Sequence, residues 1–155
     1  MAIARRPAAG KGATPPPATT TYVETSALLA ALLEQDADAQ QALRSSGRRV
    51  TSALTLVEAN RGVVRARAAG RLTQVQERRA IRALQTFAAR CDIVAIADPI
   101  LDRAGRPFPV EPIRTLDAIH LATAEFLGAP PQLVTVLTRD ARVSNNARAL
   151  GFATA

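Results

Sequence analysis

The chain has 155 residues, 48% of them hydrophobic, which is enough material for one domain with a well-developed core. Aromatic residues make up only 3% and tryptophan is absent, which argues against a protein that holds single-stranded nucleic acid on stacked aromatic rings. The formal net charge of +7 and the isoelectric point near 11.3 suit a binder of polyanions, although a genome-wide bias towards arginine and alanine would produce the same values.

The first 19 residues differ in composition from the rest of the chain. They are rich in alanine, glycine, proline and threonine, lack periodic apolar spacing and contain three consecutive prolines. We predict a disordered tail over residues 1–19 and a single domain over residues 20–155. The alternative is a basic arm that touches a nucleic acid or a partner through Arg5, Arg6 and Lys11.

From residue 20 on, short β-branched runs alternate with longer helical stretches. The first strand is predicted over 20–24 and is followed by a helix that Ser26 would cap. A second helix is expected over 36–44, before Ser45-Ser46-Gly47, and a short strand over 49–51. Ser52 then caps a helix that runs to about residue 69, and a capping box of Thr73 and Gln76 opens the next helix.

The second half of the domain continues the alternation. Strands are predicted over 91–97, 133–137 and 152–154, and helices over 115–127 and 141–150. A short helix begins at Asp98-Pro99, with Asp98 as its cap, and 106–112 is a proline-rich loop. Almost wholly apolar strands that alternate with helices predict a three-layer α/β/α sandwich with a central, mostly parallel sheet.

Four carboxylates stand in apolar stretches where a solvated surface acid is not expected: Glu24, Glu58, Asp117 and Asp140. Two of them follow predicted strands and two lie near the beginnings of predicted helices. Both places belong to the edge of a parallel sheet where binding sites form. Because carboxylates in apolar surroundings need a partner, the four together indicate a site for a hard divalent ion, Mg²⁺ or Mn²⁺. The alternative is that they are helix caps or surface acids.

Three other residues have competing interpretations. His120, the only histidine, lies three residues after Asp117 and is expected to serve packing rather than metal binding. Arg61, one helical turn after Glu58, is the best candidate among many arginines between residues 61 and 90 to contact a nucleic-acid backbone; a solvated face is the alternative. The single Cys91 excludes an intramolecular disulfide and is expected to be a buried core residue.

Four segments, in this order, resemble the PIN-domain nucleases and, among them, the VapC toxins of bacterial toxin–antitoxin pairs. The segments are Tyr-Val-Glu-Thr-Ser-Ala-Leu-Leu (22–29), Thr-Ser-Ala-Leu-Thr-Leu-Val-Glu (51–58), Arg-Thr-Leu-Asp-Ala-Ile-His-Leu-Ala-Thr-Ala (114–124) and Leu-Thr-Arg-Asp (137–140), which leads to Ala-Leu-Gly-Phe (149–152). Each segment alone is weakly specific, but their order in a chain of this length makes the resemblance fairly specific.

The resemblance implies a Mg²⁺- or Mn²⁺-dependent endoribonuclease that cleaves RNA with a metal-activated water and leaves a 5′-phosphate and a 3′-hydroxyl. It makes Glu24, Glu58, Asp117 and Asp140 the catalytic metal ligands and gives Ser26 and Thr138 supporting roles. It also implies a small antitoxin partner that covers the acidic pocket, a homodimer and a cytoplasmic location. No apolar run is long enough to span a membrane, in agreement with that location.

Position 24 departs from the family pattern, in which the first acid is normally aspartate. The extra methylene of Glu24 could displace the ion, shift the preference towards Mn²⁺ or weaken the activity, because Mg²⁺ demands strict octahedral geometry. An alternative function is therefore a catalytically weak or inactive PIN-like module that binds RNA or a protein. A different Mg²⁺ phosphohydrolase is a third possibility, but the chain has no phosphate-binding glycine loop to favour it.

Overall fold

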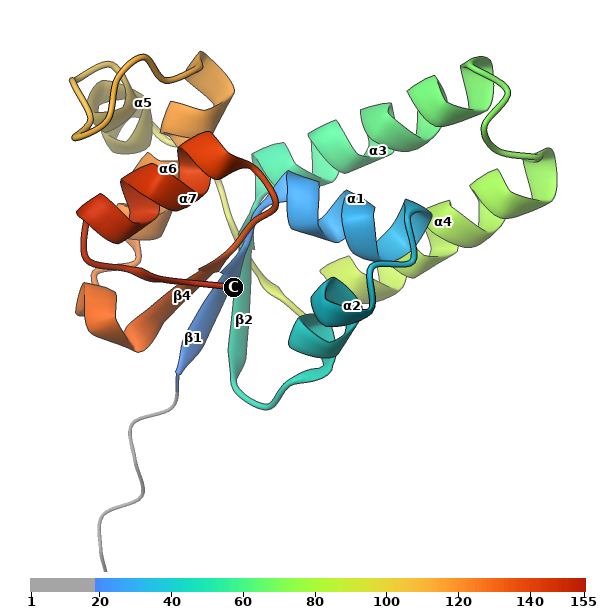
Figure 1. Cartoon of the computed structure of the whole chain (residues 1–155), viewed down its shortest axis with the longest axis horizontal. Coiled ribbons are helices and arrows are strands. Elements are labelled where there is room, and N and C mark those ends of the chain that lie inside the picture. Colours follow the sequence, from blue (N-terminus) through green and yellow to red (C-terminus); the bar gives the residue numbers. More distant parts are fainter. Residues whose placement is uncertain (1–18) are drawn as a thin grey trace, which may run out of the picture.

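The computed structural model describes residues 19–155, so the predicted tail lies outside the described residues apart from Thr19 (Figure 1). The strands are β1 (Thr20–Val23), β2 (Arg48–Ser52), β3 (Asp92–Val94), β4 (Val134–Leu137) and β5 (Ala153–Thr154). The helices are α1 (Thr25–Leu33), α2 (Ala37–Arg44), α3 (Ala53–Ala68), α4 (Gln74–Ala88), α5 (Asp98–Ala104), α6 (Thr115–Phe126) and α7 (Ala141–Ala149). A 3₁₀ turn, Pro131–Leu133, leads into β4.

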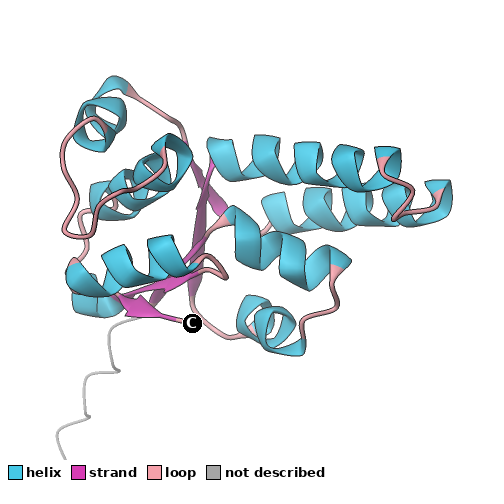
Figure 2. Cartoon of the chain, turned by 45° about the horizontal axis from the view of Figure 1, so that its top comes forward, coloured by secondary structure: helices cyan, strands magenta, loops and turns pink. Residues whose placement is uncertain are grey.

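The five strands form one parallel sheet in the order β3-β2-β1-β4-β5. In the centre of this sheet Tyr22 of β1 lies opposite Val50 of β2 on one side and Val136 of β4 on the other. Helices lie on both sides of the strands (Figure 2). The predicted three-layer α/β/α sandwich is therefore confirmed.

The core is divided by the sheet into two clusters, because successive side chains of a strand point to opposite faces. Tyr22 belongs to a cluster with Ile100, Leu121 and Val143, which come from α5, α6 and α7. The next residue, Val23, belongs to the other cluster, whose members Leu28, Ala59 and Leu84 come from α1, α3 and α4. The two helical layers thus meet the same strand through alternate residues.

One close contact brings α3 against α1. A Cβ atom added to Gly62 would lie 2.8 Å from Cδ1 of Leu29. Only side-chain atoms of Leu29, which is not fully buried, would meet such a Cβ, so Leu29 packs directly over the bare backbone of α3 at Gly62. Glu58 lies one turn earlier on α3.

Several helix boundaries agree with the predictions. The side chain of Ser52 accepts a hydrogen bond from the Thr55 amide at the start of α3, and Thr73 and Gln76 form the predicted capping box of α4. Gly128, which follows α6, has the left-handed backbone that commonly ends a helix, with φ of 66°.

Four local predictions were wrong. Ser26 lies inside α1, and the cap is Glu24, whose longer side chain reaches the Ser26 amide. Ala97 rather than Asp98 precedes α5, because Asp98 already has helical geometry. The strand predicted over 91–97 is limited to β3, an edge strand that pairs only opposite Val50–Ser52 of β2. Cys91, just before β3, is only partly buried for the same reason, since an edge strand is covered less completely.

The strand order reverses direction at β1. The chain proceeds outwards from β1 to β2 and β3, then crosses to the other side of β1 to form β4 and β5. The loops that leave β1 and β4 consequently run to opposite faces of the sheet and open a crevice at the carboxyl ends of these two strands. Among residues 19–155, no helix is both long and apolar enough to cross a membrane.

Candidate metal centre

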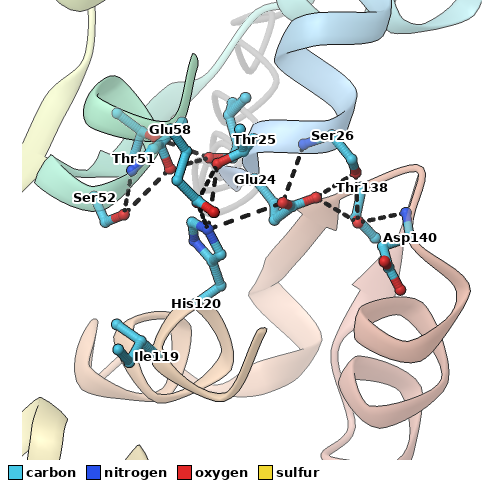
Figure 3. A network of polar contacts seen from close by, with 12 residues as sticks. Glu24, Thr25, Ser26, Thr51, Ser52, Glu58, Ile119, His120, Thr138 and Asp140 are labelled. Carbon is cyan, nitrogen blue, oxygen red and sulfur yellow. Dashed lines mark hydrogen bonds and ion pairs between the residues drawn. The ribbon is translucent and has the colours of Figure 1, made fainter. Parts of the chain in front are cut away.

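The loops that leave β1 and β4 carry two of the four predicted acids. Glu24 follows the last residue of β1, and its amide donates a hydrogen bond of 3.0 Å to the Leu137 carbonyl at the end of β4. Thr138 and Asp140 come directly after β4. The ends of these two strands therefore bring Glu24, Thr138 and Asp140 close together (Figure 3).

Glu24 is buried, with 5% of its surface exposed, and is held by three donors. Its Oε1 accepts from the Ser26 amide at 3.0 Å, and its Oε2 accepts from the hydroxyls of Ser26 and, at 2.8 Å, Thr138. The Ser26 hydroxyl also accepts from the Arg139 amide at 2.7 Å. Both predicted supporting residues thus donate to the carboxylate of Glu24. The longer side chain of this residue folds back over the start of α1, where it caps the helix.

Glu58, the sixth residue of α3, points towards α1 and α6. Its Oε2 accepts from the hydroxyl of Thr25 at 2.7 Å and lies 2.7 Å from Nε2 of His120. Partial burial raises the pKa of this carboxyl, but the hydrogen bonds from His120 and Thr25 outweigh burial and hold the pKa below its usual value. Glu58 is consequently ionised at neutral pH.

Asp117 lies in the first turn of α6 and has a buried carboxylate oxygen, Oδ2, that finds no hydrogen-bond partner among residues 19–155. Burial raises the pKa of this side chain, and the negative charges of Asp140 and Glu24 raise it further. An oxygen that is both unpaired and repelled by other carboxylates is costly to keep, and a bound cation would remove both penalties.

Asp140 is the cap of α7 and accepts from the Arg142 amide at 2.7 Å. Its own amide donates to the Thr138 hydroxyl at 3.1 Å, which links it to the hydroxyl that contacts Glu24. The cap interpretation and the site interpretation of this residue are therefore compatible. One carboxylate oxygen serves the helix, and the side chain as a whole is near enough to raise the pKa of Asp117.

Asp117 is near enough to Asp140 and Glu24 for their charges to act on it, and His120 lies between Glu24 and Glu58, but the four acids do not form a closed set. Within residues 19–155, no three aspartate, glutamate, histidine or cysteine side chains are gathered closely enough to hold an ion in their present positions. The four side chains nevertheless suit a hard divalent ion as ligands, because all of them are carboxylates and one has an oxygen without a hydrogen-bond partner among residues 19–155.

Sequence reasoning did not foresee the contacts of His120. It is 1% exposed, as expected for a packed residue, but its ring also bonds Glu58 and the Tyr22 hydroxyl. The sequence did contain one indication of these contacts, because a residue three positions after Asp117 lies on the same face of the helix as that acid. Among the arginines, Arg61 is exposed on α3, and the charge of Arg65 helps to lower the pKa of Glu58.

Comparisons with known proteins identify the family. A family model described as PIN domain matches residues 21–149. Ribonuclease VapC46 of Mycobacterium tuberculosis is 38% identical over 138 residues, covering 85% of this chain and 93% of VapC46, and ribonuclease VapC35 of that species is 34% identical over 136 residues, with the same coverage.

A solved structure shows the same fold. VapBC2 from Rickettsia felis, bound to a DNA fragment from its promoter, aligns with a TM-score of 0.62 at 15% identity, covering 88% of this chain and 97% of the other. The family match and the two ribonuclease relatives agree, and the chain belongs to the PIN-domain family.

Proposed function

We propose that this protein is a metal-dependent endoribonuclease of the VapC type and the toxin of a toxin–antitoxin pair. The observation that carries the proposal is the buried Oδ2 of Asp117, which has no hydrogen-bond partner among residues 19–155 and belongs to a side chain whose pKa the charges of Asp140 and Glu24 raise. The identity to ribonucleases VapC46 and VapC35 supports RNA as the substrate class.

The residues that would hold the ion are Asp117, Asp140, Glu24 and Glu58. A bound Mg²⁺ or Mn²⁺ supplies a Lewis acid for the phosphodiester and lowers the pKa of a bound water, so no protein nucleophile is needed. Thr138 and Ser26 hold the Glu24 carboxylate in one orientation. Arg61 and Arg65, on the hairpin formed by α3 and α4, would attract the phosphates that these acids repel.

The proposed antitoxin would cover the acid-lined crevice with a basic side chain while its helix lies in an apolar groove of the toxin. Such a side chain would neutralise the same carboxylates that the ion neutralises, so antitoxin and metal would compete. The homodimer remains a prediction.

Replacing Asp117 by asparagine tests the proposed activity, because it keeps the shape of the side chain and removes its charge. We expect the purified Asp117→Asn protein to lose RNA cleavage in Mg²⁺ or Mn²⁺ by at least about a hundredfold, and its expression no longer to arrest growth. Asp98→Asn is the matched control, since Asp98 also lies in a first helical turn but is exposed.

A wild-type protein that binds RNA but cleaves none at any metal concentration would favour the alternative of an inactive binding module. Equal cleavage by the wild type and Asp117→Asn would exclude this site altogether.

A further inference from the structure

Behind the proposed metal centre, a chain of buried polar groups connects three elements of the fold. The Tyr22 hydroxyl, on β1, lies 2.9 Å from Nδ1 of His120, on α6, and Nε2 of the same ring lies 2.7 Å from Oε2 of Glu58, on α3 (Figure 3). Tyr22 is 0% and His120 is 1% exposed. Two polar side chains buried so completely need defined hydrogen bonds, and each bond here has good length.

The hydrogen bond between His120 and Glu58 has a defined direction. Glu58 is ionised and can only accept, so Nε2 of His120 carries a hydrogen and donates it. At the other end, the Tyr22 hydroxyl can donate to Nδ1 or accept from it, because a phenol does both, and its contact with Nδ1 fixes the orientation of the ring.

The two oxygens of Glu58 are consequently used differently. Oε2 accepts from His120 and Thr25, which occupies both of its lone pairs. Oε1 accepts no hydrogen bond within residues 19–155 and stays available to a ligand. Nε2 of His120 is also 3.9 Å from Oε1 of Glu24, so the ring lies between two of the proposed metal ligands.

We propose that Tyr22 and His120 are positioning residues that hold Glu58 by its Oε2 and present its Oε1 to the metal ion. This inference rests on the proposed function, since it assigns how one ligand of that site is oriented. Groups that orient a metal ligand through a hydrogen bond typically contribute 10- to 100-fold to metal affinity or activity. His120 therefore contributes without touching the ion or the RNA.

Three substitutions separate the hydrogen bond from packing. His120→Gln can place an amide N–H near the position of Nε2, whereas the amide of His120→Asn is too short to reach Glu58. Tyr22→Phe removes only the hydroxyl that holds the ring at Nδ1. We expect His120→Asn to weaken Mn²⁺ binding about tenfold and Tyr22→Phe by a similar factor, while His120→Gln restores most of the affinity.

The measurement is the Mn²⁺ dissociation constant from electron paramagnetic resonance titration of the full chain, with thermal unfolding to show that each variant is folded. Proton–nitrogen spectra of the metal-free protein report the hydrogen bonds of the two ring nitrogens separately, and Tyr22→Phe should shift the Nδ1 signal of His120. If Tyr22 acts through Glu58, its substitution should have no further effect on Mn²⁺ affinity in a Glu58→Gln background.

The outcomes distinguish this inference from the proposed function. A wild type that binds Mn²⁺ normally, together with folded His120→Asn and Tyr22→Phe variants of unchanged affinity, would overturn the positioning role alone. A folded wild type that binds no Mn²⁺ would overturn the metal centre and the positioning role together.

Discussion

The unpaired carboxylate of Asp117 should make the metal-free protein less stable than a variant that lacks this charge. Asp117→Asn removes the repulsion from Asp140 and Glu24 and replaces Oδ2 by a group that can donate to them. An unsatisfied buried polar group costs about 1–3 kcal/mol, and the low end applies because the Asp117 side chain is only partly buried. We therefore expect a gain of about 1 kcal/mol, or a rise of about 3 °C in Tm for a domain of this size.

The pH dependence of this gain follows from the direction of the pKa shift. The pKa of Asp117 is raised above its ordinary value of 3.8, so folding favours the protonated form. Below that value wild type and Asp117→Asn should be equally stable. As the pH rises through the raised pKa, the wild type should lose stability relative to the variant, and the difference should be constant at higher pH.

The assay is thermal unfolding of both proteins in a metal chelator and then in excess Mg²⁺. At ten times its dissociation constant, bound Mg²⁺ should stabilise the wild type by about 1.4 kcal/mol and Asp117→Asn much less, which reverses their order. Asp98→Asn serves again as the control and should follow the wild type in both conditions. If Asp117→Asn is no more stable than the wild type in chelator at pH 7, the account of Asp117 as an uncompensated charge is wrong.

Three further substitutions test other parts of the site. Glu24→Asp shortens the arm by one methylene and should raise the ratio of Mg²⁺-supported to Mn²⁺-supported cleavage; an unchanged ratio in a cleavage assay with each ion would show that the methylene does not set the preference. Thr138→Val keeps the shape but removes the donor to Glu24, so metal-dependent cleavage should fall about tenfold; wild-type cleavage would dismiss this supporting role. Gly62→Val places atoms against Leu29. It should lower the free energy of unfolding in urea by about 1–3 kcal/mol and reduce cleavage, whereas Ala68→Val, exposed on the same helix, should change both little.

Much of the fold could be predicted because its signals are local. Apolar runs, capping residues such as Ser52 and Thr73, and the glycine after α6 each act within a few residues, and the structure retains them. The errors had two causes. Glu24 caps α1 although serine is the commoner cap, and the strand predicted over 91–97 is short because only part of it pairs with β2, a distant segment.

The chain by itself determined that four carboxylates interrupt apolar segments, and the alternation of strands and helices was sufficient to bring them to one edge of a parallel sheet. Only the tertiary structure decided how each acid is held. Thr138 contacts Glu24 across 114 positions of the chain, and His120 contacts Glu58 across 62. Such pairs leave no periodic trace in a sequence, because their spacing depends on strand order and on the packing of helices rather than on any local repeat.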